Sequence, residues 1–286
     1  MKNIFEIMEL VKKMNELGFK VEFGKKNSNG VKYNTLIIGE GNIRPAFTID
    51  ADLIDEIRNV GVEAVAKRIV RTLDNDSDAP AINPKEIASA NYFRKNAFFT
   101  VGNKAMAEDK TIVGYVQNDV FYYIRVNAGN GSFVVKKGML AALQLNEDEL
   151  FEMAKANQIR RSDKLESVGA CIMSMLGDSA PVGVTDTPEM LIITTKDKVL
   201  GASLAFIPEY MDKLLSSMNL KRVFVLPSSI HECLIVTIVP ENDDEVAPAL
   251  SELTEMVREV NSSAVKESEV LADHAYLYTV GKGLTA

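Results

Sequence analysis

The side chains that could do chemistry gather near the C-terminal end of the chain. They are two serines, both histidines of the protein and two carboxylates: Ser228, Ser229, His231, Glu232, Asp273 and His274. Residues two apart in an extended strand point to the same face, so Ser229 and His231 could form a nucleophile–base pair. Asp273 could then orient the imidazole, as in a hydrolase triad. The sequence thus offers Ser229, His231 and Asp273 as candidate catalytic residues, with Ser228, Glu232 and His274 as candidate binding residues.

A structural interpretation competes with the hydrolase. The sequence has no G-x-S-x-G nucleophile elbow around Ser229 and no glycine-rich loop nearby that would form an oxyanion hole. The segment after Pro227 also fits a tight turn, in which serine hydroxyls accept from backbone amides and His231 hydrogen-bonds across a sheet. The turn is the favoured interpretation.

Metal and cofactor sites are not predicted. His231 and Glu232 are adjacent, as are Asp273 and His274, and adjacent strand residues point to opposite faces. At most one of each pair could then bind a metal, which disfavours a closed tetrahedral site. The glycine pairs at 39–41 and 129–131 lack the third glycine of a dinucleotide fingerprint, and the sequence has no P-loop. Cys233 lies in an apolar run and is typical of a small buried residue.

Composition restricts the class of partner. The chain has 286 residues, 40 of them acidic and 32 basic, for a net charge of −8. Nucleic-acid binding needs a clustered basic surface, and the densest basic runs, such as Lys25-Lys26, are two residues long. We expect no direct nucleic-acid binding, and no membrane segment because Glu6 and Glu9 interrupt the apolar N-terminus. Two cysteines without a CxxC pair indicate the cytoplasm, with both thiols reduced.

The N-terminal segment, residues 1–78, is predicted to combine helices with a hairpin. Residues 3–17 have helical periodicity, with an apolar stripe that includes Ile4, Ile7, Met8, Val11 and Met14. Residues 19–38 alternate as two strands around the turn at 27–30, and 44–49 form a third strand. Asp50 is a candidate N-cap for a helical stretch, broken near Gly61, that ends about residue 73. The polar run 74–80 is predicted to be an exposed loop.

Two further segments follow, a middle one at 79–186 and a C-terminal one at 187–286, which could form one continuous domain. In the middle segment, residues 117–119 are predicted to connect a hairpin, and Asn146 is the candidate N-cap of a helix. The C-terminal pattern is ββαββα, with 200–206 pairing back on the strand at 190–195, and 177–188 forming a loop. The predicted class is α+β, with antiparallel sheets and packed helices.

Three C-terminal stretches carry a resemblance to a known family. They are VFVLPSSIHECLIV (223–236), LTEMVREVNSSAV (253–265) and SEVLADHAYLY (268–278). They resemble domain-of-unknown-function family number 5688, uncharacterised proteins of gut Firmicutes and their mobile elements. Residues 120–157 and 190–214 are similar more loosely, and Ala275 departs from the β-branched residue usual at its position. The resemblance implies a shared fold and supplies no activity.

The absence of a complete catalytic set favours a non-enzymatic binding or regulatory protein that acts through a protein partner. The alternative is a hydrolase or metal-dependent enzyme centred on Ser229, His231 and Asp273. The sequence leaves both hypotheses open.

Overall fold

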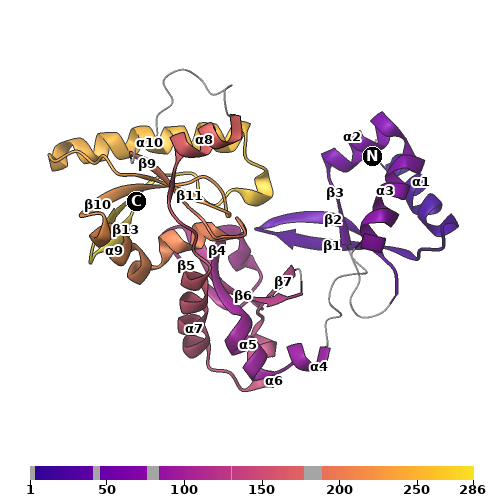
Figure 1. Cartoon of the computed structure of the whole chain (residues 1–286). Helices are drawn as coiled ribbons and strands as arrows, with labels where there is room; N and C mark the ends of the chain where they lie inside the picture. Colours follow the sequence, from indigo (N-terminus) through magenta and orange to yellow (C-terminus); the bar gives the residue numbers. More distant parts are fainter. Residues whose placement is uncertain (1–3, 41–45, 76–83, 130, 177–188) are drawn as a thin grey trace. The chain divides into compact units, whose positions relative to one another are not determined.

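The computed structural model describes residues 4–40, 46–75, 84–129, 131–176 and 189–286. The chain divides into two compact units, Met1–Ala81 and Ile82–Ala286 (Figure 1). The second unit contains both the middle and the C-terminal segments of the sequence. The predicted loop at 177–188 lies outside the described residues, as do residues 76–80 of the predicted loop at 74–80, whose first two residues end a helix.

The first unit is a three-stranded antiparallel sheet with helices packed on one face. The strands, in the order β1-β2-β3, are β1 (Val21–Ser28), β2 (Val31–Ile38) and β3 (Ala46–Ile49). The helices are α1 (Ile4–Glu16), α2 (Ala51–Val60) and α3 (Val62–Asn75). Asp50 caps α2 as predicted, since its side chain accepts a hydrogen bond from the Leu53 amide at 2.9 Å. The break at Gly61 is also confirmed.

The buried side of α1 differs from the prediction. The residues that α1 buries are Ile7, Leu10 and Met14, which pack with Leu36 and Ile38 of the sheet. Ile4 and Met8, predicted to belong to the buried stripe, are 59% and 61% exposed. The helix therefore carries more apolar surface than the core of its unit covers.

The second unit has two antiparallel sheets that share one core. The first sheet pairs β4 and β5 with β6, and β6 with β7, and its strands are β4 (Ala97–Asn103), β5 (Gly114–Gln117), β6 (Val120–Ala128) and β7 (Gly131–Val134). The second has the order β13-β12-β10-β11-β9-β8, with β8 (Glu166–Ser167), β9 (Met190–Ile193), β10 (Arg222–Pro227), β11 (Cys233–Val236), β12 (Tyr276–Thr279) and β13 (Gly283–Thr285). With its helices, this arrangement confirms the α+β class.

Helices cover the sheets of the second unit (Figure 1). They are α4 (Pro84–Ile87), α5 (Ala90–Asn96), α6 (Lys137–Leu143), α7 (Glu147–Arg160), α8 (Val168–Leu176), α9 (Pro208–Ser217) and α10 (Asp243–Ser263). Short 3₁₀-helices add η2 (Lys104–Glu108), η4 (Gly201–Phe206) and η5 (Glu267–Glu269). Asn146 caps α7 as predicted, at 3.0 Å from the Glu149 amide. Alternation along β10 places Phe224 against α10, and Val223 and Val225 in the core with η4 and α9.

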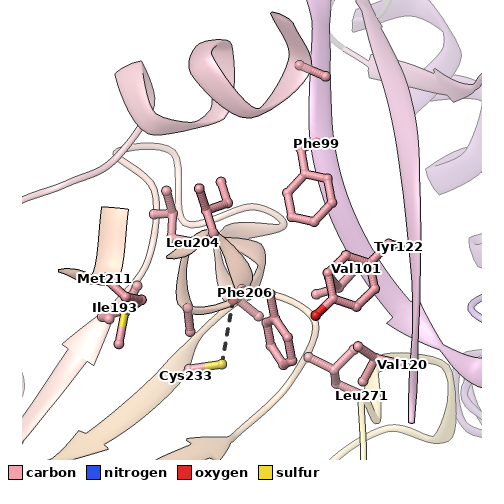
Figure 2. Packing of buried hydrophobic residues seen from close by; sticks show 14 of the residues in the cluster. Phe99, Val101, Val120, Tyr122, Ile193, Leu204, Phe206, Met211, Cys233 and Leu271 are labelled. Atoms are coloured by element: carbon pink, nitrogen blue, oxygen red, sulfur yellow. Dashed lines mark hydrogen bonds between the residues drawn. The ribbon is translucent and has the colours of Figure 1, made fainter. Parts of the chain in front are cut away.

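The prediction of a strand at 200–206 was wrong. Gly201–Phe206 is the 3₁₀-helix η4, and all six of its residues are buried. Figure 2 shows Leu204 and Phe206 of η4 between the β4–β6 sheet, with Phe99 and Tyr122, and the other sheet, with Ile193 and Cys233. A strand would place alternate residues on opposite faces. The residues of η4 are instead buried all around the short helix, within the core that the two sheets share. It is therefore the central packing element of the second unit.

Candidate functional site

His231 lies in the turn between β10 and β11, where its atoms hold other parts of the backbone in place. The ring atom Nδ1 accepts a hydrogen bond from the Leu200 amide at 3.2 Å. The His231 carbonyl accepts from the Gly201 amide at 2.9 Å and from the Thr194 hydroxyl at 3.0 Å. These three bonds connect the turn to the start of η4 and to the end of β9. We call this arrangement the His231 clamp.

The serines of the cluster belong to the same turn. Ser229 Oγ accepts from the His231 amide at 3.0 Å, and the Ser229 amide donates to the Glu232 carbonyl at 3.2 Å. These are the bonds of a serine-stabilised turn. Ser228 and Glu232 are half-buried in the same turn. Ser229 is thus bonded to the backbone of His231 while the imidazole is bonded to Leu200.

Asp273 is bonded to a different element. Its carboxylate accepts from Asn261 Nδ2 of α10 at 2.9 Å, and its carbonyl accepts from Arg258 Nε at 3.2 Å. The side chain of Asp273 is exposed. The three members of the proposed triad therefore each have hydrogen-bond partners outside it, and these contacts do not favour Ser–His–Asp chemistry.

Metal binding by the cluster finds no support either. Within the described part of the chain, no group of three or more His, Cys, Asp and Glu side chains could hold a metal ion. Cys233 is fully buried, as predicted, and its Sγ lies 3.7 Å from the Ala202 carbonyl (Figure 2). Burial raises the pKa of the Cys233 thiol well above its usual range, and the nearby Glu232 raises it further. Such a thiol is a packing group, because its nucleophilic thiolate form is disfavoured.

His274 is half-buried and lies at the edge of a pocket. It lines a pocket of about 420 Å³ between β12, α10 and the β5–β6 turn, with neighbours that include Asp119, Thr254 and Arg258. Its ring packs on Tyr276 with 4.5 Å between centroids. The Nε2 atom is buried and has no hydrogen-bond partner within the described residues. Burial lowers the pKa of His274, and the charges of Lys104 and Arg258 lower it further, while the carboxylates of Asp119 and Asp273 raise it without reversing the net effect.

The pKa of His274 leads to a testable pH dependence. Between about pH 7 and pH 5.5, across the ordinary imidazole pKa of about 6.5, the unfolded chain takes up more protons at this position than the folded chain. The free energy of unfolding should therefore fall as the pH is lowered through this range. Urea unfolding at several pH values measures this slope, and His274→Gln should make it smaller. An equal slope in the variant would contradict the prediction.

A different kind of surface lies on the first unit. An apolar groove of about 330 Å³ runs between α1 and the sheet, and we call it the α1–β1 groove. Its lining residues are Ile4, Ile7, Met8, Phe23, Asn34, Ile49 and Ile54. Phe23 is 62% exposed, similar to Ile4 and Met8. Exposed apolar residues that are grouped in this way mark interaction surfaces more often than isolated ones do.

Positive charge continues the same sheet face beyond the groove. Phe23 pairs with Leu36, and Lys25 pairs with Asn34, so Phe23, Lys25 and Asn34 share one face. Lys32, opposite Asn27, also belongs to that face. Both lysines are exposed. The surface is therefore apolar near α1 and basic toward the hairpin tip.

The sequence contains an indication of this groove that helical periodicity alone does not reveal. The apolar residues of α1 are spread more widely than one buried face requires, since Phe5 also is exposed. Phe23 lies in an edge strand whose residues from Lys25 to Ser28 are all polar. An excess of large apolar residues on both elements was the available indication.

Comparison with known proteins identifies the family. No helix in the described residues is long and apolar enough to cross a membrane. No curated protein matches the chain, and no solved structure does. The model of a family of unknown function (DUF5688) matches residues 4–280, nearly the whole chain. The protein therefore belongs to this family of unknown function.

Proposed function

We propose that the protein is a non-enzymatic binding or regulatory protein, and that a protein partner docks in the α1–β1 groove. The observation that carries the proposal is the exposure of Ile4, Met8 and Phe23 around one groove. Burying large apolar side chains stabilises a complex by about 1.5–3 kcal/mol for each one fully covered. A groove with several such residues can therefore supply most of the affinity for a short segment.

The chemistry of the groove specifies the partner. An amphipathic helix that presents apolar residues at i, i+3, i+4 and i+7 fits an apolar groove. Lys25 and Lys32 at one end favour acidic residues at the corresponding end of that helix. We therefore expect a helical segment with an apolar stripe and an acidic terminus. The net charge of −8 disfavours nucleic acid as the direct partner.

The enzyme alternative is less well supported. A hydrolase needs Ser229 Oγ within hydrogen-bond reach of the His231 ring, with Asp273 behind it. Instead, Ser229 accepts from the His231 backbone, and the ring accepts from Leu200. These contacts account for the serine and the histidine as turn and clamp residues.

The proposal extends to the setting of the protein. Cys171 and Cys233 are both free, which fits the reducing cytoplasm. The resemblance of residues 223–278 to proteins of gut Firmicutes and their mobile elements suggests such a bacterium as the host. A regulatory protein that binds another protein is consistent with this setting.

A selection experiment tests the docking surface. The purified full chain is used to select helical peptides from a random display library. The selected peptides should share an apolar stripe with acidic residues at one end. Met8→Glu should weaken their binding by about tenfold or more, because a charge in an apolar groove is costly to desolvate.

The matched control is Met175→Glu. Met175 lies on α8 of the second unit and is 73% exposed. The same substitution there introduces the same charge at a similarly exposed methionine outside the groove. It should leave peptide binding unchanged. Failure to enrich any peptide, or equal loss of binding in both variants, would count against the groove.

A further inference from the structure

The second unit contains another pocket that is separate from the cluster around His231 and His274. It has a volume of about 210 Å³ and lies where β5, β6 and α7 meet η4, α9 and the β12–β13 hairpin. We call it the tyrosine pocket. Its lining residues are Tyr115, Gln117, Asn118, Tyr122, Lys155, Ala205, Phe206, Pro208, Tyr278, Lys282, Gly283 and Leu284.

The inner walls of the tyrosine pocket are aromatic and fixed in place. Tyr122, Phe206 and Tyr278 are almost fully buried. The Tyr278 hydroxyl donates to an Asp212 carboxylate oxygen at 2.8 Å. The Tyr122 hydroxyl accepts from Asn118 Nδ2 at 3.2 Å, which leaves its proton free to donate. Walls held by packing and hydrogen bonds need little reorganisation when a ligand binds, which favours affinity.

Tyr115 provides a partly open surface for stacking. Its ring is stacked on that of Tyr122, with 5.2 Å between centroids and 17° between planes. The Tyr115 ring also makes a tilted contact with the Phe151 ring, at 5.5 Å between centroids. Tyr115 is 42% exposed. A planar ring entering the pocket can pack against these two tyrosines in the offset or edge-on geometry that aromatic pairs prefer.

The charged groups in the lining are both cationic. Lys155 belongs to α7 and Lys282 to the β12–β13 turn, and the lining includes no carboxylate side chain. Lys155 Nζ donates to Glu152 at 2.8 Å, which uses one of its three protons. Burial alone would lower the pKa of Lys155, but the hydrogen bond and charge of Glu152, with a contribution from the charge of Glu209, raise it, so the ammonium form is maintained. Two of the surrounding acids are already bonded, Glu152 to Lys155 and Asp212 to Tyr278.

Size limits the ligand to one ring. An apolar cavity of about 150 Å³ is enough to hold benzene. The tyrosine pocket, at about 210 Å³, has room for one ring and a small substituent. We propose that this pocket binds a monocyclic aromatic carboxylate, with the ring against Tyr115 and Tyr122 and the carboxylate on the Lys155 ammonium. This site is independent of the α1–β1 groove.

The experiment uses benzoate as the probe and the full chain as the receptor. Isothermal titration or ligand-observed NMR should detect benzoate with a Kd on the order of 1 mM, as expected for a ligand of this size. Lys155→Met should weaken binding about tenfold, because it removes a charge-assisted hydrogen bond while keeping an unbranched side chain. Benzylamine, which has the same ring and the opposite charge, should bind at least tenfold more weakly than benzoate.

The matched control is Lys213→Met, an exposed lysine on α9 outside the pocket lining. It should leave the benzoate Kd unchanged. The proposal is overturned if benzoate does not bind, if Lys155→Met binds it as well as the wild type, if Lys213→Met weakens it equally, or if benzylamine binds as tightly. If circular dichroism shows that Lys155→Met does not fold, the test is made on the wild-type protein by measuring nuclear Overhauser effects from benzoate. Effects to the Tyr115 and Tyr122 rings support the site, and their absence overturns it.

Discussion

Replacing Gly201 with alanine is expected to destabilise the second unit by about 3 kcal/mol, the upper part of the usual range for overpacking. A Cβ at this position would lie 2.5 Å from the Thr195 amide nitrogen and 2.7 Å from the His231 carbonyl oxygen. Both are backbone atoms, and the His231 carbonyl is held by the His231 clamp, which also bonds Thr194, the neighbour of Thr195, so these atoms cannot move aside cheaply. The substitution would also push apart the hydrogen bond between the Gly201 amide and His231.

Gly138→Ala is the matched control for this prediction. A Cβ at Gly138, in α6, would meet no atom within 4 Å. Alanine in a helix is favoured over glycine by roughly 0.5–1 kcal/mol, so this variant should be as stable as the wild type or slightly more stable. Urea unfolding can be followed by tyrosine fluorescence, because Tyr33 is the only one of the eight tyrosines before residue 82, and the chain has no tryptophan. Equal stability of the Gly201 and Gly138 variants would contradict the prediction.

Phe206→Ala is expected to have a similar or larger effect, a loss of about 3–5 kcal/mol in the free energy of unfolding. The Phe206 ring makes edge-on contacts with Tyr122 at 6.0 Å and with Tyr276 at 5.7 Å. These two tyrosines belong to different sheets, so Phe206 joins the two halves of the shared core. Its truncation leaves a cavity that the surrounding sheets can only partly fill.

Two further variants control for the size and place of the change. Phe206→Leu keeps most of the apolar volume and should cost less than the alanine variant. Met175→Ala truncates a large apolar side chain of the same unit at a position that is 73% exposed, and it should change the stability by less than about 0.5 kcal/mol. The same unfolding measurement applies, and a loss below about 1 kcal/mol for Phe206→Ala would show that the ring is not central to the core.

The features that the sequence predicted correctly depend on local chemistry. Asp50 and Asn146 cap their helices because a short polar side chain at an N-cap bonds to an amide only three residues away. The predicted hairpin connection at 117–119 is the turn between β5 and β6, where Asn118 and Asp119 adopt φ values of 50° and 59°. Asparagine and aspartate tolerate this left-handed conformation better than other residues with side chains. These features can be predicted without knowing which distant residues the segment will contact.

The features that the sequence missed depend on tertiary contacts. Residues 200–206 are apolar enough for a buried strand, but Gly201 approaches the backbone of Thr195 and His231, and the segment turns into η4. Likewise, the periodicity of α1 showed an apolar stripe without showing which part of it the sheet covers. The tyrosine pocket combines Tyr115, Lys155 and Tyr278, which lie far apart in the chain. No spacing rule connects such residues.

The polar cluster that first suggested chemistry illustrates both cases. The turn after Pro227, which contains Ser228, Ser229, His231 and Glu232, was predicted correctly, and Ser229 does stabilise it. The partner of the His231 ring, the Leu200 amide, could not be found by sequence reasoning because it is brought near by the folding of η4. The sequence therefore showed which residue types were present and what chemistry they allow, but the role of each residue depends on the fold.

The central claim, that the α1–β1 groove is the docking surface, can be tested most directly by hydrogen exchange. The full chain is compared with and without a peptide chosen by the display selection. The account predicts that the peptide slows amide exchange in α1, Ile4–Glu16, and in the β1–β2 hairpin, Val21–Ile38, and leaves the second unit unchanged. Protection confined to the second unit, or no protection at all, would contradict the account.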